Sequence, residues 1–119
     1  MFTEQDYYQL PTHCPEYINI GFKVHQEENL PSGVYQDPET KLYYAVAFHG
    51  NRNSPVFQNP HTDPFKAHQQ WQNLWIGSMR QALQYYNFSE LYNEKMAKGI
   101  RVTIEKVQED YDQGEETLF

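Results

Sequence analysis

The sequence predicts an α+β fold in a single domain: a four-stranded antiparallel sheet, one long helix packed on it, and a second short helix. A chain of 119 residues fits one ordinary domain with one core. Apolar residues alternate in three stretches, which is the period of half-buried strands. Through residues 64–86 they recur instead at helical spacing, so a long helix should cover the sheet.

The N-terminal part is expected to hold a short helix and the first strand. Thr3 and Asp6 have the spacing of a capping pair and Pro11 ends the pattern, which predicts a helix over residues 4–9. The stretch YINIGFKV then alternates strictly, which predicts a strand. Its apolar positions are Ile18, Ile20, Phe22 and Val24.

The next stretch, GVYQDPETKLYYAVAF, predicts a β-hairpin. Asp37 and Pro38 favour a turn, because proline presets one backbone angle and aspartate bonds the following amides. In the second arm one face carries Leu42, Tyr44, Val46 and Phe48. Residues 49–64 are predicted to be loop from their composition.

The long helix is expected from about residue 64 to 86. Asp63 is placed to cap it and Pro64 suits its first turn. Trp71 and Trp75 are predicted to be mainly core, and Gly77 is interpreted as a position of close packing. The apolar positions at helical spacing are Phe65, Trp71, Leu74, Trp75, Met79, Ala82 and Leu83.

A short helix and a last strand complete the expected domain. Ser89 is a candidate cap for a helix that ends near Lys98, with Gly99 in the closing position. The stretch IRVTIEKV then returns to strand period. Its apolar positions are Ile100, Val102 and Ile104.

The net charge of −7 is concentrated at one end of the chain. Residues 108–119 hold five acids and no base, which leaves 11 acids against nine Lys and Arg in residues 1–107, a net of −2. We therefore predict a domain of residues 1–107 and an acidic C-terminal tail of residues 108–119. The body shows neither the basic patch of a nucleic-acid binder nor the spread acidity of a DNA mimic.

Composition also bears on the compartment. The sequence shows no secretory signal pattern and no membrane-spanning stretch, so a soluble cytoplasmic protein with no membrane partner is expected. The single cysteine, Cys14, is interpreted as a small packed residue.

We find no sequence pattern that predicts catalysis, a cofactor or a metal. The closest metal-like group is His61, Asp63 and His68, but its spacing is not that of paired zinc ligands. Cys14 beside His13 does not form a nucleophile and base, because adjacent side chains rarely face each other. A non-enzymatic protein is therefore predicted.

The aromatic residues are candidates for partner binding. Adjacent tyrosine pairs cannot all face one core, so some should be exposed at a protein interface or packed at the rim of the core. The predicted partner-binding residues are Tyr43, Tyr85, Tyr86, Tyr92, Leu118 and Phe119.

Two resemblances suggest partners. Asn59-Pro60 followed by a helix with His68, Trp71, Trp75 and the pair Gly77-Ser78 resembles the helical core of ribosome modulation factor over about 25 residues. That family is strongly basic and binds ribosomal RNA, with relatives on phages. The ending EDYDQGEETLF resembles the acidic tips of single-stranded DNA-binding proteins and, loosely, sliding-clamp ligands, which implies docking of an apolar end into a pocket.

These observations predict a small acidic interaction protein without catalysis that binds a macromolecule, most simply another protein. The resemblance implies a phage or mobile-element modulator, for example an inhibitor of host nucleic-acid or defence machinery. The alternative is a ribosome or RNA-binding factor. Nucleic acid is not favoured, because the long helix carries only Lys66 and Arg80 as basic residues.

Overall fold

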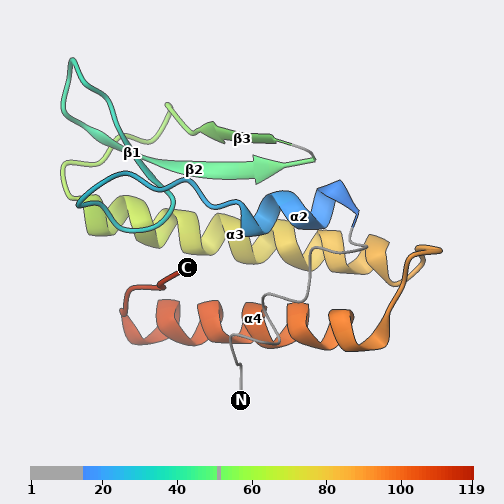
Figure 1. The fold of residues 1–119 in the computed structure, drawn as a ribbon. Helices are drawn as coiled ribbons and strands as arrows, with labels where there is room; N and C mark the ends of the chain where they lie inside the picture. The colour runs from blue at the N-terminus through green and yellow to red at the C-terminus, as the bar shows by residue number, and fades with distance from the viewer. Residues whose placement is uncertain (1–14, 51) are drawn as a thin grey trace.

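The computed structural model describes residues 15–50 and 52–119 as an α+β domain, so the helix expected over residues 4–9 and Cys14 lie outside the described part. The domain has three layers, with the sheet on one side, α3 in the middle and α4 on the other side (Figure 1). The elements in order are α2 (Glu16–Phe22), β1 (Val34–Gln36), β2 (Tyr43–His49), β3 (Arg52–Pro55), α3 (Pro64–Tyr86) and α4 (Glu94–Gln113).

The predicted β-hairpin is confirmed. Strands β1 and β2 pair antiparallel, with Val34 opposite Ala45 and Tyr35 opposite Tyr44. The turn forms as its sequence predicts, because Asp37 Oδ1 accepts a hydrogen bond of 2.8 Å from the backbone N–H of Glu39.

The third strand lies in the segment that was predicted to be loop. Strand β3 pairs antiparallel with β2, and the order β1-β2-β3 gives three strands in the described residues. The expected four-stranded sheet is therefore wrong. The sequence RNSP has no apolar alternation, and its proline is tolerated because β3 lies at the edge of the sheet.

Residues 16–22 form helix α2 and not the predicted first strand. The alternating pattern also places Ile18 and Phe22 four apart, so a short apolar run fits both structures and its packing decides between them. Ile18 is fully buried, and α2 packs on α3 so closely that a Cβ added to Gly21 would lie 2.3 Å from Met79 Cε. A strand here would lose that contact.

The short helix and last strand predicted for residues 89–107 are also wrong, because α4 runs unbroken from Glu94 to Gln113. Asn93 caps it, accepting a hydrogen bond of 3.1 Å from the N–H of Met96. Gly99 lies inside the helix and is buried instead of ending it. The core face repeats at helical spacing through Ala97, Ile100, Ile104 and Val107.

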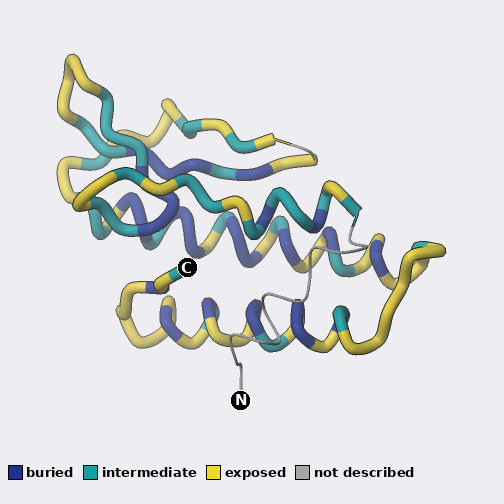
Figure 2. The backbone as a smooth tube through the Cα atoms, viewed as in Figure 1, coloured by how far each residue is buried: buried dark blue, intermediate teal, exposed yellow. Residues whose placement is uncertain are grey.

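Helix α3 has the predicted boundaries, and its tryptophans are core as predicted. Asp63 caps it by accepting from the N–H of Phe65 at 3.0 Å. Trp71 is 2% exposed and Trp75 is 1% exposed. Because α3 contacts both the sheet and α4, it buries residues on two sides (Figure 2). Gly77, interpreted as a packing position, is instead exposed, and an added Cβ would meet nothing within 4 Å in the part of the chain that the structure describes.

The expected acidic tail is built into this arrangement. Residues 108–113 are the last turns of α4, and Gly114 ends the helix in the left-handed conformation at φ 70°. Residues 115–119 then turn back toward α3, where Thr117 is 3% exposed (Figure 1). The boundary expected after Val107 therefore falls inside a helix. No helix among the described residues is long and apolar enough to cross a membrane.

Candidate functional site: an aromatic turn and a C-terminal site

The end of α3 and the connection to α4 carry an exposed apolar surface. The exposed fractions are 64% for Tyr85, 92% for Phe88, 53% for Leu91 and 39% for Tyr92, and we call these four residues the aromatic turn. Figure 2 shows this end of the molecule as largely exposed. Apolar patches rimmed by polar residues mark interaction sites, because their exposure to water is unfavourable until a partner covers them.

Tyr86 holds the aromatic turn in place from beneath. Its side chain is fully buried, and its hydroxyl accepts from the N–H of Asn93 at 2.8 Å and donates to the carbonyl of Leu91 at 3.0 Å. The ring stacks on Tyr92 with centroids 5.5 Å apart and an interplanar angle of 7°. The connection is thus fixed by hydrogen bonds and packing, which lowers the entropy lost when a partner binds.

A cavity of about 300 Å³ lies beside the aromatic turn and shares Tyr85 with it. Its lining combines apolar Phe48 of β2 and Ala82 of α3 with polar Ser78 and Gln81 of α3. A hollow of this kind next to exposed aromatic rings can receive one anchoring side chain of a partner.

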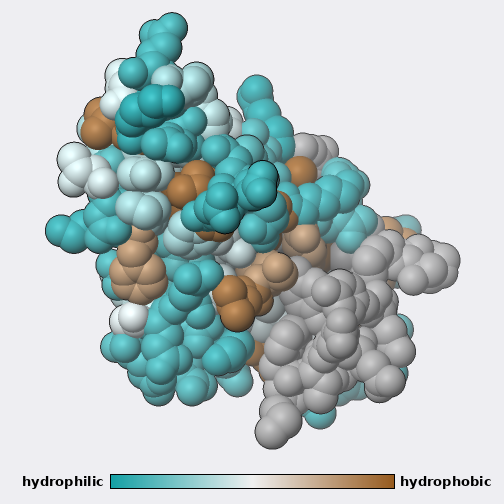
Figure 3. Space-filling model, turned by 60° about the vertical axis from the view of Figure 1, so that its left-hand side comes forward, coloured by the Kyte–Doolittle hydropathy of each residue, from teal (hydrophilic) through white to brown (hydrophobic). Residues whose placement is uncertain are grey.

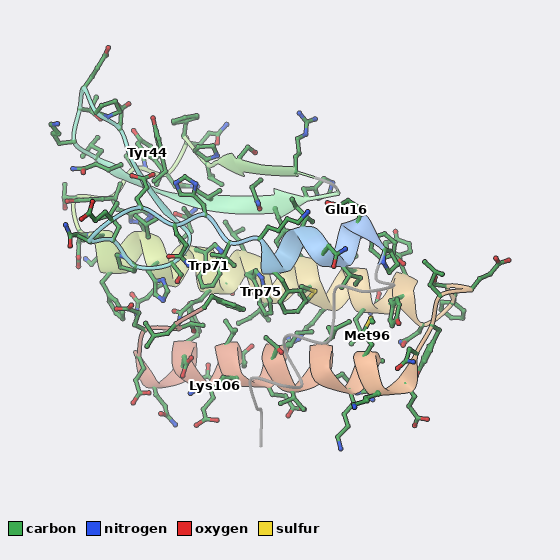
Figure 4. The ribbon with its side chains drawn as sticks, in the orientation of Figure 1. Glu16, Tyr44, Trp71, Trp75, Met96 and Lys106 are labelled. Atoms are coloured by element: carbon green, nitrogen blue, oxygen red, sulfur yellow. The ribbon has the colours of Figure 1, made fainter. Side chains whose placement is uncertain are left out.

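The second feature is the C-terminal site, which holds residues 115–119. Phe119 lies against Trp71, Trp75 and Phe22, with ring centroids 5.6, 5.5 and 6.5 Å away. Figure 4 shows Trp71 and Trp75 between α3 and α4, on the side of the C-terminal segment. The C-terminal site consists of Phe22, His68, Trp71, Gln72, Trp75 and Asp110.

His68 contributes a fully buried imidazole to this site. Its Nδ1 lies 2.7 Å from the carbonyl of Ser32, and its Nε2 lies 2.9 Å from the N–H of Thr117. The carbonyl can only accept and the N–H can only donate, so the ring is neutral with its proton on Nδ1. Burial lowers the pKa of His68 below its ordinary 6.5 and outweighs the hydrogen bond to Ser32 and the charges of Glu116 and Asp110, which raise it.

The Thr117 hydroxyl connects α3 to α4 through buried polar groups. It donates to Asp110 Oδ2 at 2.8 Å and accepts from Gln72 Nε2 at 2.9 Å. Lys106 bonds the other Asp110 oxygen at 2.8 Å, and this hydrogen bond raises the pKa of Lys106. Gln72 also donates to the carbonyl of Glu115 at 2.9 Å. The Glu115 carbonyl, the Thr117 N–H and the Thr117 hydroxyl of the bound segment therefore all have partners in the C-terminal site.

The predicted partner-binding residues do not form one surface. Tyr85 and Tyr92 belong to the aromatic turn, whereas Tyr86 is buried beneath it. Tyr43 lies at the start of β2, at the opposite end of the domain (Figure 1), and its backbone pairs with His61. Leu118 is 82% exposed, and Phe119 packs against the core of its own chain.

The sequence analysis did not single out Phe88 and Leu91, which are 92% and 53% exposed and belong to the aromatic turn together with Tyr85. The available signal was that both apolar residues lie close to Ser89 in the sequence and belong to no periodic pattern. It also missed Thr117, Gln72 and Asp110. No local pattern marks them, because their contacts span up to 45 positions of the chain.

The metal-like group of the sequence is dispersed among different partners. His61 Nε2 lies 2.6 Å from Gln70 Oε1, Asp63 caps α3, and His68 is held by Ser32 and Thr117. Residues 15–50 and 52–119 contain no cluster of three or more His, Cys, Asp or Glu able to hold a metal. The pair His13 and Cys14 lies outside these residues.

Comparison with known proteins adds no relative: no family model matches the chain, and no curated protein or solved structure gives a significant match. The candidate function therefore depends on the chemistry of the two features described above.

Proposed function

We propose that this protein is a non-enzymatic binding protein that captures a protein partner through the aromatic turn. The observation that carries the proposal is the exposure of Tyr85, Phe88, Leu91 and Tyr92 within eight residues, on a connection fixed by Tyr86. Aromatic side chains dominate the energetics of protein interfaces, because they bury large areas at small entropic cost.

The chemistry around the aromatic turn favours a protein over RNA. Glu90 lies within it and Glu94 follows it, and both would repel phosphates. The rings that carry the resemblance to ribosome modulation factor, Trp71 and Trp75, are 2% and 1% exposed, so they cannot stack on bases. The face in Figure 3 is mostly hydrophilic with scattered apolar atoms, which leaves the aromatic turn as the stronger candidate. Because residues 59–83 resemble a family that has relatives on phages, we propose that the protein partner belongs to host nucleic-acid or defence machinery.

Affinity capture from a bacterial lysate tests the proposal. The test variant is Phe88→Ser with Leu91→Ser, which removes apolar surface without touching the core. The matched control is Leu118→Ser, because Leu118 is equally exposed but lies away from the aromatic turn. We expect the wild-type chain and the control to capture the same protein and the double variant to lose at least about tenfold of that signal. Equal capture by all three would refute the proposed surface.

A salt titration addresses the alternative. Binding through an apolar surface should change little between low and moderate salt, whereas RNA binding should weaken steeply as phosphate counterions are released. Capture of RNA that falls steeply with salt would replace the proposal with the RNA-binding function.

A further inference from the structure

We propose that the C-terminal site also binds residues 115–119 of a second copy of this chain, so that two chains form a dimer by exchanging their C-terminal segments. This inference goes beyond the proposed function, because it uses a different surface and a different partner. It depends on how the segment is bound, on how it is connected to α4, and on the balance between binding to its own site and binding to the site of a second copy.

The segment is bound as a peptide ligand would be. Thr117 is buried and Phe119 is half-buried in the site, whereas Glu116 and Leu118 face outward, which is the alternation of an extended peptide. Its hydrogen bonds to Gln72, His68 and Asp110 all leave the segment for α3 or α4. A second copy of the same segment can make every one of these contacts.

The connection to the segment is one residue in an unusual conformation. Gly114 ends α4 at φ 70° and ψ 27°, and this left-handed geometry turns the chain back toward its own site. The N–H of Glu115 returns to the carbonyl of Asp110 at 2.8 Å. A negative φ at position 114 would break this return turn and so release Thr117 and Phe119 from their own site, which leaves them able to bind a neighbouring molecule. Gly114 is therefore the hinge of the exchange.

The balance between the closed and the exchanged form depends on the hinge and on concentration. In the closed form the short connection gives the segment an effective concentration of about millimolar, so the wild-type chain should be monomeric at micromolar concentration. Exchange retains the contacts of the site, so its cost is mainly the entropy of association. Strain placed on the left-handed hinge shifts the balance toward the dimer.

Gly114→Val provides that strain without a clash among the described residues. A Cβ at position 114 would meet none of their atoms within 4 Å, so the substitution acts through the backbone conformation, which a β-branched residue adopts only with strain. Exchange relieves the backbone strain at position 114 in both chains of a dimer. We therefore expect the dissociation constant of the dimer, measured by sedimentation equilibrium, to fall by at least about tenfold relative to wild type.

The chain contains a matched control. Gly50 has φ 61°, and no atom of residues 15–50 and 52–119 lies within 4 Å of an added Cβ, so Gly50→Val imposes the same backbone strain far from the hinge. This variant should lose stability and stay monomeric. Dimerisation of both variants to the same extent would overturn the proposal, because it would reflect general destabilisation.

An isotope-filtered NMR experiment tests the contact itself. In a mixture of labelled and unlabelled Gly114→Val chains, we expect contacts between the Phe119 ring of one copy and the Trp75 ring of the other, which lie 5.5 Å apart by centroid in the closed form. Adding Phe119→Ala should abolish the dimer. Where Gly114→Val does not fold, Gly114→Ala and the wild-type chain at millimolar concentration serve in its place. Absence of intermolecular contacts in these samples overturns the proposal, as does a dimer that persists with Phe119→Ala.

Discussion

The backbone N–H of Thr117 donates a hydrogen bond of 2.9 Å to Nε2 of His68, which lies 49 positions earlier in the chain. This bond requires a neutral imidazole, because a protonated Nε2 would present a hydrogen to the hydrogen of the N–H. The attachment of the C-terminal segment is thereby coupled to the protonation of one buried histidine.

The first prediction is a loss of stability at mildly acidic pH. Burial lowers the pKa of His68 in the folded chain, whereas in the unfolded chain the ring takes up a proton near 6.5. Below that pH the unfolded state binds more protons, so the contribution of His68 is complete above about 6.5 and decreases toward the lower folded-state pKa. Urea unfolding at stepped pH should show a decline of up to about 1.4 kcal/mol per pH unit from this group.

His68→Gln is the control for this prediction. Glutamine offers a side-chain oxygen that can accept from Thr117, but it does not titrate in this range. The variant should be less stable than wild type at neutral pH and should show a shallower decline between pH 6.5 and 5. An unchanged slope would assign the pH dependence to other groups.

The second prediction concerns the two final side chains. Phe119→Ala should lower the free energy of unfolding by about 2 kcal/mol, less than for a fully buried phenylalanine, because the side chain is only partly buried against the core. Leu118→Ala should change it by less than about 0.5 kcal/mol, since Leu118 is 82% exposed. Chemical denaturation of the pair checks this, and equal effects would contradict the described packing.

The third prediction reverses an expectation from the sequence. The predicted division into a domain of residues 1–107 and a tail implies that a chain ending after Val107 keeps its stability, but such a chain would lose the last turns of α4 along with Asp110 and Thr117. His68 and Gln72 would lose their hydrogen bonds to the segment, each worth about 0.5–1.5 kcal/mol, and the rings of Trp71 and Trp75 would lose the Phe119 ring that packs on them. We expect a large fall in melting temperature by circular dichroism. A truncated chain that melts like wild type would show that the segment contributes nothing to the fold.

The fourth prediction contrasts two glycines. Gly33 has φ 76°, and a Cβ there would lie 2.2 Å from the Trp71 ring, so Gly33→Ala should unfold or severely destabilise the domain. Gly77 lies in α3 with open space around an added Cβ, so Gly77→Ala should stabilise by up to about 1 kcal/mol. Thermal melts of both variants test this contrast. A mild effect at Gly33 would mean that Trp71 can move aside.

The fifth prediction concerns Trp75. Trp75→Ala should cost about 3–5 kcal/mol, since the ring is buried between α3 and the C-terminal segment. Trp75→Phe should lower the free energy of unfolding by less than Trp75→Ala does, but by more than the smaller ring volume alone would. The reason is that Trp75 Nε1 donates to the carbonyl of Gly21 at 2.7 Å, and that carbonyl would lose its partner. Retained stability in Trp75→Ala would contradict the core position.

Elements with strong local signals were predictable, and elements decided by packing were not. The hairpin around Asp37 and the helix capped by Asp63 carry their turn and cap chemistry in adjacent residues. Helix α2 has only seven residues, and its apolar spacing fits either structure until α3 is present. In α4 the core residues Ala97, Ile100 and Ile104 have helical spacing, but Ile100 and Ile104 also fit the strand period that was predicted, and Gly99 was interpreted as a helix end although it is an interior residue.

The candidate sites show the same limit. Exposure of the tyrosines was predicted in general, but which of two neighbours is buried depends on tertiary contacts, as Tyr85 and Tyr86 show. The acidic residues around Thr117 led to the prediction of a tail outside the domain. Net charge does not show which alternate residues of such a segment face inward. Contacts between residues 68 and 117 leave no local pattern to detect.

The position of α3 as the middle layer sets its tolerance to substitution. With the sheet on one side and α4 on the other, this helix has only a narrow line of positions open to water. Saturation mutagenesis scored by cellular abundance should therefore accept charged residues along that line and reject them elsewhere in the helix, so that permissive sites recur at helical spacing along one stripe instead of covering half of the helix surface. The open positions are Lys66, Asn73, Gly77, Arg80, Gln81, Gln84 and Tyr85.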